Sequence, residues 1–144
     1  MKKYDMSFLA LMAEAVGIVS AFLYVGLQIY YGVVYGVNMI NIIMNIVAMI
    51  LVYTGMTLLT IYPERVNGLT REVCSGDIRK YTCRMVRIAK LIFVEGLLFA
   101  CICDVLGEEI NSGYSMVIVV AIVVTAVYYE YRIIKILRER YNKK

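Results

Sequence analysis

The chain has 144 residues, of which 62% are apolar and 18% are charged, and its formal net charge at pH 7 is +4. A soluble domain has about 45–50% apolar and about 25% charged residues, so this composition excludes an ordinary soluble domain. The chain contains no histidine, which excludes His-ligated zinc, haem and di-iron sites and the Ser-His-Asp and Cys-His nucleophiles. We therefore expect an integral membrane protein that is not an enzyme and holds no cofactor or metal.

Four segments are expected to span the membrane, at about 7–28, 39–62, 88–106 and 115–134. The first two lie largely in a run without any charged residue, which extends from Ala15 to Pro63. Between them, the segment 30–38 contains glycines, tyrosines and an asparagine, a composition that predicts a turn at the membrane surface. The expected fold is all-α: one domain over residues 1–144 with four transmembrane helices.

The third expected span is the least apolar, because Glu95 and Asp104 lie inside it. Ser75 or Asp77 is expected to cap the start of its helix. We expect one continuous helix from Asp77 to Leu106, about 45 Å long at about 1.5 Å per residue. Its first turns would extend into the cytosol from the loop 63–87.

All 15 lysines and arginines lie before the first span, between the second and third, or after the fourth, except that Lys90 and Arg132 lie just inside the adjoining ends of the third and fourth spans. Basic residues stay on the cytoplasmic side of a membrane, so we expect both termini inside and the chain in the plasma (inner) membrane. The start of the chain, with Lys2 and Lys3, resembles a signal peptide. Because the apolar run continues well past Ala15, we expect no cleavage there.

Glu14 lies inside the first span, about 12 Å from its inner boundary at about 1.5 Å per residue. A charge at that depth costs about 2.5–3.5 kcal/mol, and no basic residue is expected deep enough to form a salt bridge with it. Helical spacing places Glu14 on a stripe of small and polar residues that would face another helix: Ala10, Glu14, Gly17, Ala21, Tyr24 and Gln28. We favour a functional role for this carboxyl over a structural one.

Other polar residues are expected in two layers of the bundle, one at the depth of Glu14 and one near the outer surface. The second span carries a stripe of its own, made of Asn38, Asn41, Asn45, Ala48 and Gly55. The candidates for a polar path or polar layer are Glu14, Gln28, Asn41, Asn45, Thr54, Glu95 and Asp104. For the Asn and Thr residues we favour the plainer interpretation, interhelical hydrogen bonds worth about 0.6 kcal/mol each.

Glu95 and Asp104 lie about half a turn out of phase on one helix, so they are expected to face opposite sides of it. Glu95 is shallow enough to reach Lys90 or Arg132. A bundle of four helices encloses only one side of this helix comfortably. The other side would then meet a neighbouring subunit, which predicts a homo-oligomer.

The cytosolic helix that begins near Asp77 carries four candidates for binding an anionic ligand or lipid: Arg79, Lys80, Arg84 and Arg87. We favour the interpretation that they orient the chain and contact anionic headgroups, at about 1 kcal/mol per residue. The alternative is a site for a phosphate-bearing ligand, such as an anionic nucleotide, or for an acidic partner. Nothing predicts sequence-specific recognition of a nucleic acid.

The four cysteines are expected to be free thiols that pack as small apolar side chains. Cys74 and Cys83 lie in the cytosolic segment and should stay reduced. Cys101 and Cys103 diverge by about 160° around a helix, at 3.6 residues per turn, which argues against a disulfide or a metal site between them.

Two functions remain open. The first is a homo-oligomeric pore or cation-conducting bundle, gated through the basic loop helix. The alternative is a non-conducting accessory or immunity-type subunit that binds a larger membrane partner. An intramembrane enzyme with Glu14 as acid or base lacks a second catalytic group beside it.

This plan, short and four-spanned with a charged inner loop, is similar to that of the small membrane effectors encoded beside bacterial antiphage signalling enzymes, and equally to that of many other small bacterial proteins. The resemblance implies an anionic nucleotide signal at the basic loop helix.

Overall fold

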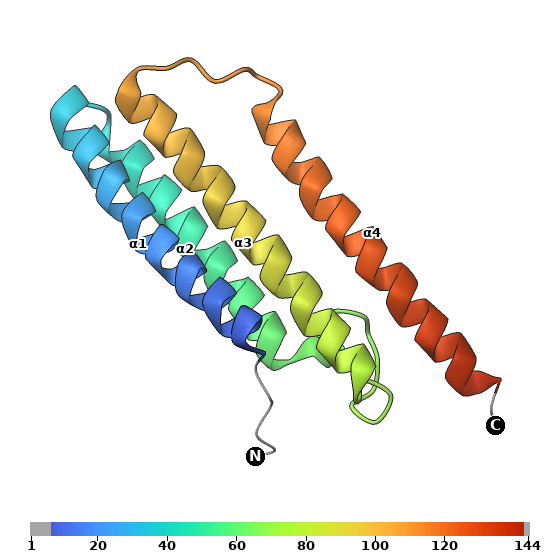
Figure 1. The fold of residues 1–144 in the computed structure, drawn as a ribbon. Helices are drawn as coiled ribbons and strands as arrows, with labels where there is room; N and C mark the ends of the chain where they lie inside the picture. Colours follow the sequence, from blue (N-terminus) through green and yellow to red (C-terminus); the bar gives the residue numbers. More distant parts are fainter. Residues whose placement is uncertain (1–6, 143–144) are drawn as a thin grey trace.

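The computed structural model describes residues 7–142 and consists of helices joined by short connections (Figure 1). The long helices are α1 (Phe8–Tyr35), α2 (Met39–Ile61), α3 (Asp77–Leu106) and α4 (Tyr114–Tyr141), and a short 3₁₀ helix, η1 (Pro63–Arg65), follows α2. The expectations about Lys2, Lys3, Lys143 and Lys144 and about the start of the chain lie outside the described residues.

Helix α1 continues to Tyr35, beyond the expected end at Gln28, so the expected turn over 30–38 is wrong for most of its length. The connection to α2 is only 36–38, and Gly36 ends α1 in the left-handed conformation with φ of 63°. Gly32 does not break the helix. It lies against Ile42 of α2, where an added Cβ would be 3.0 Å from the Ile42 side chain, so the glycine allows close helix packing.

Helix α3 has the predicted bounds, Asp77–Leu106. Its predicted cap is wrong, because Gly76 occupies the cap position with φ of 60° and no side chain caps the helix. Helix α4 extends to Tyr141, past the expected end of the fourth span near residue 134.

Helix α3 is the centre of the bundle. Helices α1, α2 and α4 all pack against it, and α1 also touches α2. Within residues 7–142, α4 contacts no other helix than α3, and it lies along the side of α3 away from α1 and α2 (Figure 1). The four helices therefore form an open arrangement, in which α4 has a single helical neighbour within the described residues.

Three of the helices, α1, α2 and α4, are long and apolar enough to cross a membrane. Large apolar side chains cover their outer surfaces, for example Phe22 (76% exposed) and Val117 (64% exposed). A surface of this kind is far more apolar than that of a soluble monomer and is consistent with a membrane protein. Helix α3 is long enough but not apolar enough to count among them, because every stretch of 18 residues within it contains at least three charged residues.

The two ends of the molecule differ in charge. The start of α1, the connection between α2 and α3 and the end of α4 lie at one end (Figure 1). We call it the basic end, because the described Lys and Arg residues lie in the connection, in the first half of α3 or toward the end of α4. The opposite end carries the connection from α3 to α4, with Glu108 and Glu109. The cytoplasmic orientation of the basic end stays a prediction.

Two buried clusters hold the helices together. In the middle of the bundle, Tyr24 of α1 and Met49 of α2 pack against Leu98 and Cys101 of α3. At the basic end, Cys74 and Ile78 pack against Ile133 of α4. The second cluster fixes the end of α4 against the start of α3.

Candidate functional site

Glu14 is the centre of an ion-pair cluster between α1, α2 and α3. Lys90 of α3 donates from Nζ to Glu14 Oε2 at 2.6 Å, and Arg87 donates from Nε to Glu14 Oε1 at 3.3 Å. Lys90 is only 2% exposed. Its ammonium also donates to Thr57 Oγ1 at 3.3 Å and lies 4.7 Å from the centre of the Tyr53 ring. These contacts all join residues of α1, α2 and α3, so the cluster lies where the three helices pack together.

The expectation that Glu14 has no counter-ion is wrong. Helix α3 runs without interruption from Asp77, so its basic residues continue up to the level of Glu14 on the parallel helix α1. Both basic side chains are long, which lets their charges reach the carboxylate. Arg87, one of the anionic-ligand candidates, is therefore used within the chain.

A line of polar contacts, which we call the polar seam, continues from this cluster along the interface of α1 and α3. Ser20 Oγ donates to Glu95 Oε1 at 2.5 Å, Gln28 Nε2 donates to Cys101 Sγ at 3.5 Å, and Tyr35 donates from its hydroxyl to the Val105 carbonyl at 2.8 Å. The partners are separated by similar distances in sequence, because α1 and α3 run parallel with a constant register. The predicted stripe on the first helix does face other helices: its buried members are Gly17, Tyr24 and Gln28, and Ser20 is buried beside them. Gly32 is buried too, but against α2.

Glu95 does not meet either expected partner. Lys90 is bound to Glu14, and Arg132 lies against the rings of Tyr81 and Tyr128. Glu95 instead accepts the hydrogen bond from Ser20. Asp104, on the opposite side of α3, is exposed, as the half-turn phase difference predicts.

The polar stripe of α2 does not face the interior. Asn41, Asn45 and Thr54 are all exposed, whereas the buried residues of this helix are Ile42 and Met49. Within the single chain these residues therefore do not join Glu14 and Gln28 in the interior, and the expected polar layers stay a prediction. Asn38 has a local role, because its side chain accepts the Ile40 backbone N–H at the start of α2.

The four basic candidates of the α3 start do not converge on one site. Arg87 binds Glu14, and Arg79 donates to the Ile61 carbonyl at the end of α2 at 3.4 Å. Arg84 is half-buried and Lys80 is exposed.

A cleft between α3 and α4 at the basic end was missed by sequence reasoning. It has a volume of about 540 Å³ and is lined by Tyr81, Tyr128, Tyr131, Arg132, Lys135, Ile136 and Glu139. The Arg132 guanidinium lies 5.3 Å from the centre of the Tyr128 ring and 5.8 Å from that of Tyr81. The sequence does place tyrosines and basic residues at helical spacing near the end of α4. It does not show that α3 packs beside them, and so it does not indicate a cleft.

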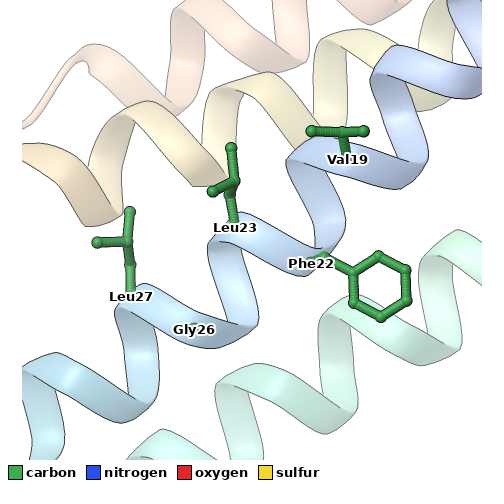
Figure 2. A pocket seen from close by; sticks show the side chains of 5 residues that line it. All are labelled: Val19, Phe22, Leu23, Gly26 and Leu27. Carbon is green, nitrogen blue, oxygen red and sulfur yellow. The ribbon is translucent and has the colours of Figure 1, made fainter.

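A second hollow lies on the outer face of α1 and is apolar. It has a volume of about 410 Å³ and is lined by Val19, Phe22, Leu23, Gly26 and Leu27. Figure 2 shows Val19, Leu23 and Leu27 projecting to one side and Phe22 projecting to the other, with Gly26 between them. No side chain that lines this hollow carries a polar group, so it offers no chemistry beyond apolar contact.

All four cysteines are free thiols. Cys101 is buried in the central cluster and Cys74 in the basic-end cluster. Burial raises the pKa of the Cys74 thiol, which lies in the connection before α3. Within residues 7–142, no three Cys, Asp or Glu side chains lie close enough together to hold a metal ion.

No protein-family model, no curated protein and no solved structure matches this chain. Its function must therefore be argued from its own residues.

Proposed function

We propose that the protein is a small polytopic protein of the plasma (inner) membrane that assembles into a homo-oligomer, with a polar, cation-conducting path between its subunits. The observation that carries this proposal is the exposed amide stripe of α2. We define the amide stripe as Asn41, Asn45, Ala48 and Gly55, which share one side of the helix and are all exposed.

Exposed amides are unfavourable in a hydrocarbon environment. Asn41 and Asn45 lie one turn apart on a helix whose other exposed residues are almost all apolar. An unpaired amide in the bilayer costs several kcal/mol by transfer estimates, whereas an interhelical hydrogen bond contributes about 0.6 kcal/mol and at most about 2. A second copy of α2 offers such partners, and small residues such as Ala48 and Gly55 allow close approach of the two helices.

The partners of the carboxylates favour a path between subunits and argue against a path through a single chain. Glu14 is held by Lys90 and Arg87, and Glu95 by Ser20. Glu14 is therefore neutralised within the chain, and Glu95 lies in the interface of α1 and α3 and does not line an open path. Asp104 remains exposed on α3 and would lie at the mouth of a path between subunits. The basic end, on the cytoplasmic side by the positive-inside rule, is where a gate would act.

An ion-flux assay in liposomes tests this proposal. The double variant Asn41→Leu/Asn45→Leu removes both amides, and we expect it to lose flux that the wild type supports. Thr54→Val is the matched control, because Thr54 is an exposed polar residue of the same helix about half a turn away from Asn45. Equal flux in the double variant and the wild type would contradict the proposal.

The ion-pair cluster favours a second candidate function, a non-conducting accessory or immunity-type subunit that binds a larger membrane partner. In that case the amide stripe binds the partner and the ion pairs serve only to hold α1 against α3. A wild-type protein that is monomeric and inert in liposomes, and that copurifies with another membrane protein unless the amides are replaced, supports this alternative.

A further inference from the structure

We propose that the cleft between α3 and α4 binds the phosphate headgroup of an anionic phospholipid. The cleft is distinct from the amide stripe, and its role does not depend on whether the protein conducts ions. It lies at the basic end, where the side chains of Tyr81 from α3 and of Tyr128 and Arg132 from α4 meet.

The geometry of the cleft suits a phosphate group. Arg132 lies against the rings of both Tyr81 and Tyr128, and its Nη1 donates to the Tyr81 hydroxyl at 3.5 Å. A guanidinium held against aromatic rings is oriented in advance, so less freedom is lost when it binds a phosphate. Lys135, nearly one turn further along α4, lines the same cleft and adds a second positive charge.

These two charges form no ion pair with the rest of the described chain. Within residues 7–142, the ion pairs join Glu64 to Arg71 and Glu14 to Arg87 and Lys90. Glu139 also lines the cleft, but no ion pair of 4 Å or less joins it to Arg132 or Lys135 in that part of the chain. The lining therefore has an excess of positive charge, with two cations and one carboxylate.

The surroundings favour a lipid over a soluble phosphate compound. Tyr131 is 70% exposed beside the cleft, and the neighbouring turn of α4 exposes Val124 and Val127. Tyrosines mark the boundary between headgroups and acyl chains, and basic pockets between helices on the cytoplasmic side are typical sites for anionic headgroups. A bound phospholipid would place its phosphate against Arg132 and its chains along the apolar face of α4.

The test measures lipid binding by the purified full-length protein in detergent, with native mass spectrometry as the readout. The probes are short-chain phosphatidylglycerol, short-chain phosphatidylcholine, inorganic phosphate and ATP. The variant Arg132→Gln/Lys135→Gln removes both charges of the cleft. Arg65→Gln/Arg138→Gln is the matched control, since it also removes two positive charges, and both arginines are exposed at the same end but do not line the cleft.

We expect the wild type to retain phosphatidylglycerol in preference to phosphatidylcholine. The cleft variant should bind phosphatidylglycerol about tenfold to thirtyfold more weakly, at about fivefold for each basic residue, whereas the control variant should keep its affinity. Lys135→Gln alone, at an exposed position, should weaken binding about fivefold and serves if the double variant does not fold. Equal losses in both double variants, no preference between the two lipids, or tighter binding of phosphate or ATP than of phosphatidylglycerol would overturn the proposal.

Discussion

Lys90 Nζ lies 2.6 Å from Glu14 Oε2, and this contact joins α3 to α1 inside the bundle. Glu14 is 19% exposed at its side chain and Lys90 only 2%, so the pair is largely shielded from its surroundings. A buried ammonium is unfavourable unless a carboxylate and hydrogen-bond acceptors surround it. Glu14 supplies the carboxylate and Thr57 a further acceptor, which gives Glu14 a structural role. A functional role for this carboxyl stays a prediction.

Lys90→Met should destabilise the protein, because it leaves Glu14 with Arg87 as its remaining partner. Removing one member of a buried ion pair costs about 3–5 kcal/mol. The second partner and the partial exposure of Glu14 reduce the expected loss to about 1–3 kcal/mol of unfolding free energy. Unfolding in mixed micelles measures it. Lys80→Met, at an exposed lysine, is the control and should change stability by less than about 0.5 kcal/mol.

The double variant Lys90→Met/Glu14→Gln should recover part of the stability that Lys90→Met loses. It removes both charges of the pair and leaves no carboxylate that needs a counter-ion. The contrary outcome is that Glu14→Gln lowers the stability of Lys90→Met as much as it lowers that of the wild type. The two residues would then be energetically independent, and the ion-pair cluster would have no structural role.

Gly96→Ala should weaken the packing of α4 against α3. An added Cβ at Gly96 would lie 2.8 Å from Ile118 Cδ1, so the Ile118 side chain must shift, and Tyr114 donates to the Gly96 carbonyl beside it at 3.0 Å. Overpacking of this kind costs about 1–3 kcal/mol. Gly26→Ala is the control, because nothing lies within 4 Å of its added Cβ and alanine favours the helix by up to about 1 kcal/mol. Equal stabilities of the two variants would show that α4 does not pack as described.

Cys74 should react slowly with a maleimide in the folded protein. Its side chain is only 3% exposed, and burial raises its pKa. The reactive form is the thiolate, so a raised pKa lowers its fraction at pH 7 and moves the onset of the reaction to higher pH. Alkylation of a variant that keeps Cys74 as its only cysteine, followed by mass spectrometry with and without denaturant, measures this. Equal rates in both conditions would contradict the buried position.

The bounds and the buried face of a helix were predictable where its glycine and polar residues determine them. Asp77–Leu106 is predicted as one helix and is one, because it contains no proline and its single glycine, Gly96, packs against Ile118 without ending the helix. The buried stripe of α1 was predictable from Gly17 and Gln28, since small and amide residues at helical spacing mark a packed face. The end of α1 was not, because Gly32 was interpreted as part of a turn when it serves close packing against Ile42.

The arrangement of α2 and α4 was not predictable from the sequence. In a bilayer, apolar residues suit both the lipid and the interior, so a helix such as α2 carries no periodic signal for its buried face. Ile42 and Met49 face the other helices while Asn41 and Asn45 are exposed. The partners of Glu14 were missed for another reason: the reach of Lys90 depends on the register between α1 and α3, which spacing along one helix does not contain.

Cysteine crosslinking across the amide stripe tests most directly whether copies of α2 face each other. Ala48→Cys lies between the asparagines and Gly55 on that stripe, and Ile43→Cys is the control at an exposed position about 140° away around the helix. In native membranes, with the wild type as background, we predict that Ala48→Cys yields a crosslinked dimer with a short bifunctional reagent and that Ile43→Cys does not. Failure of Ala48→Cys to crosslink, or equal dimer yields from the two variants, would contradict self-association through this face.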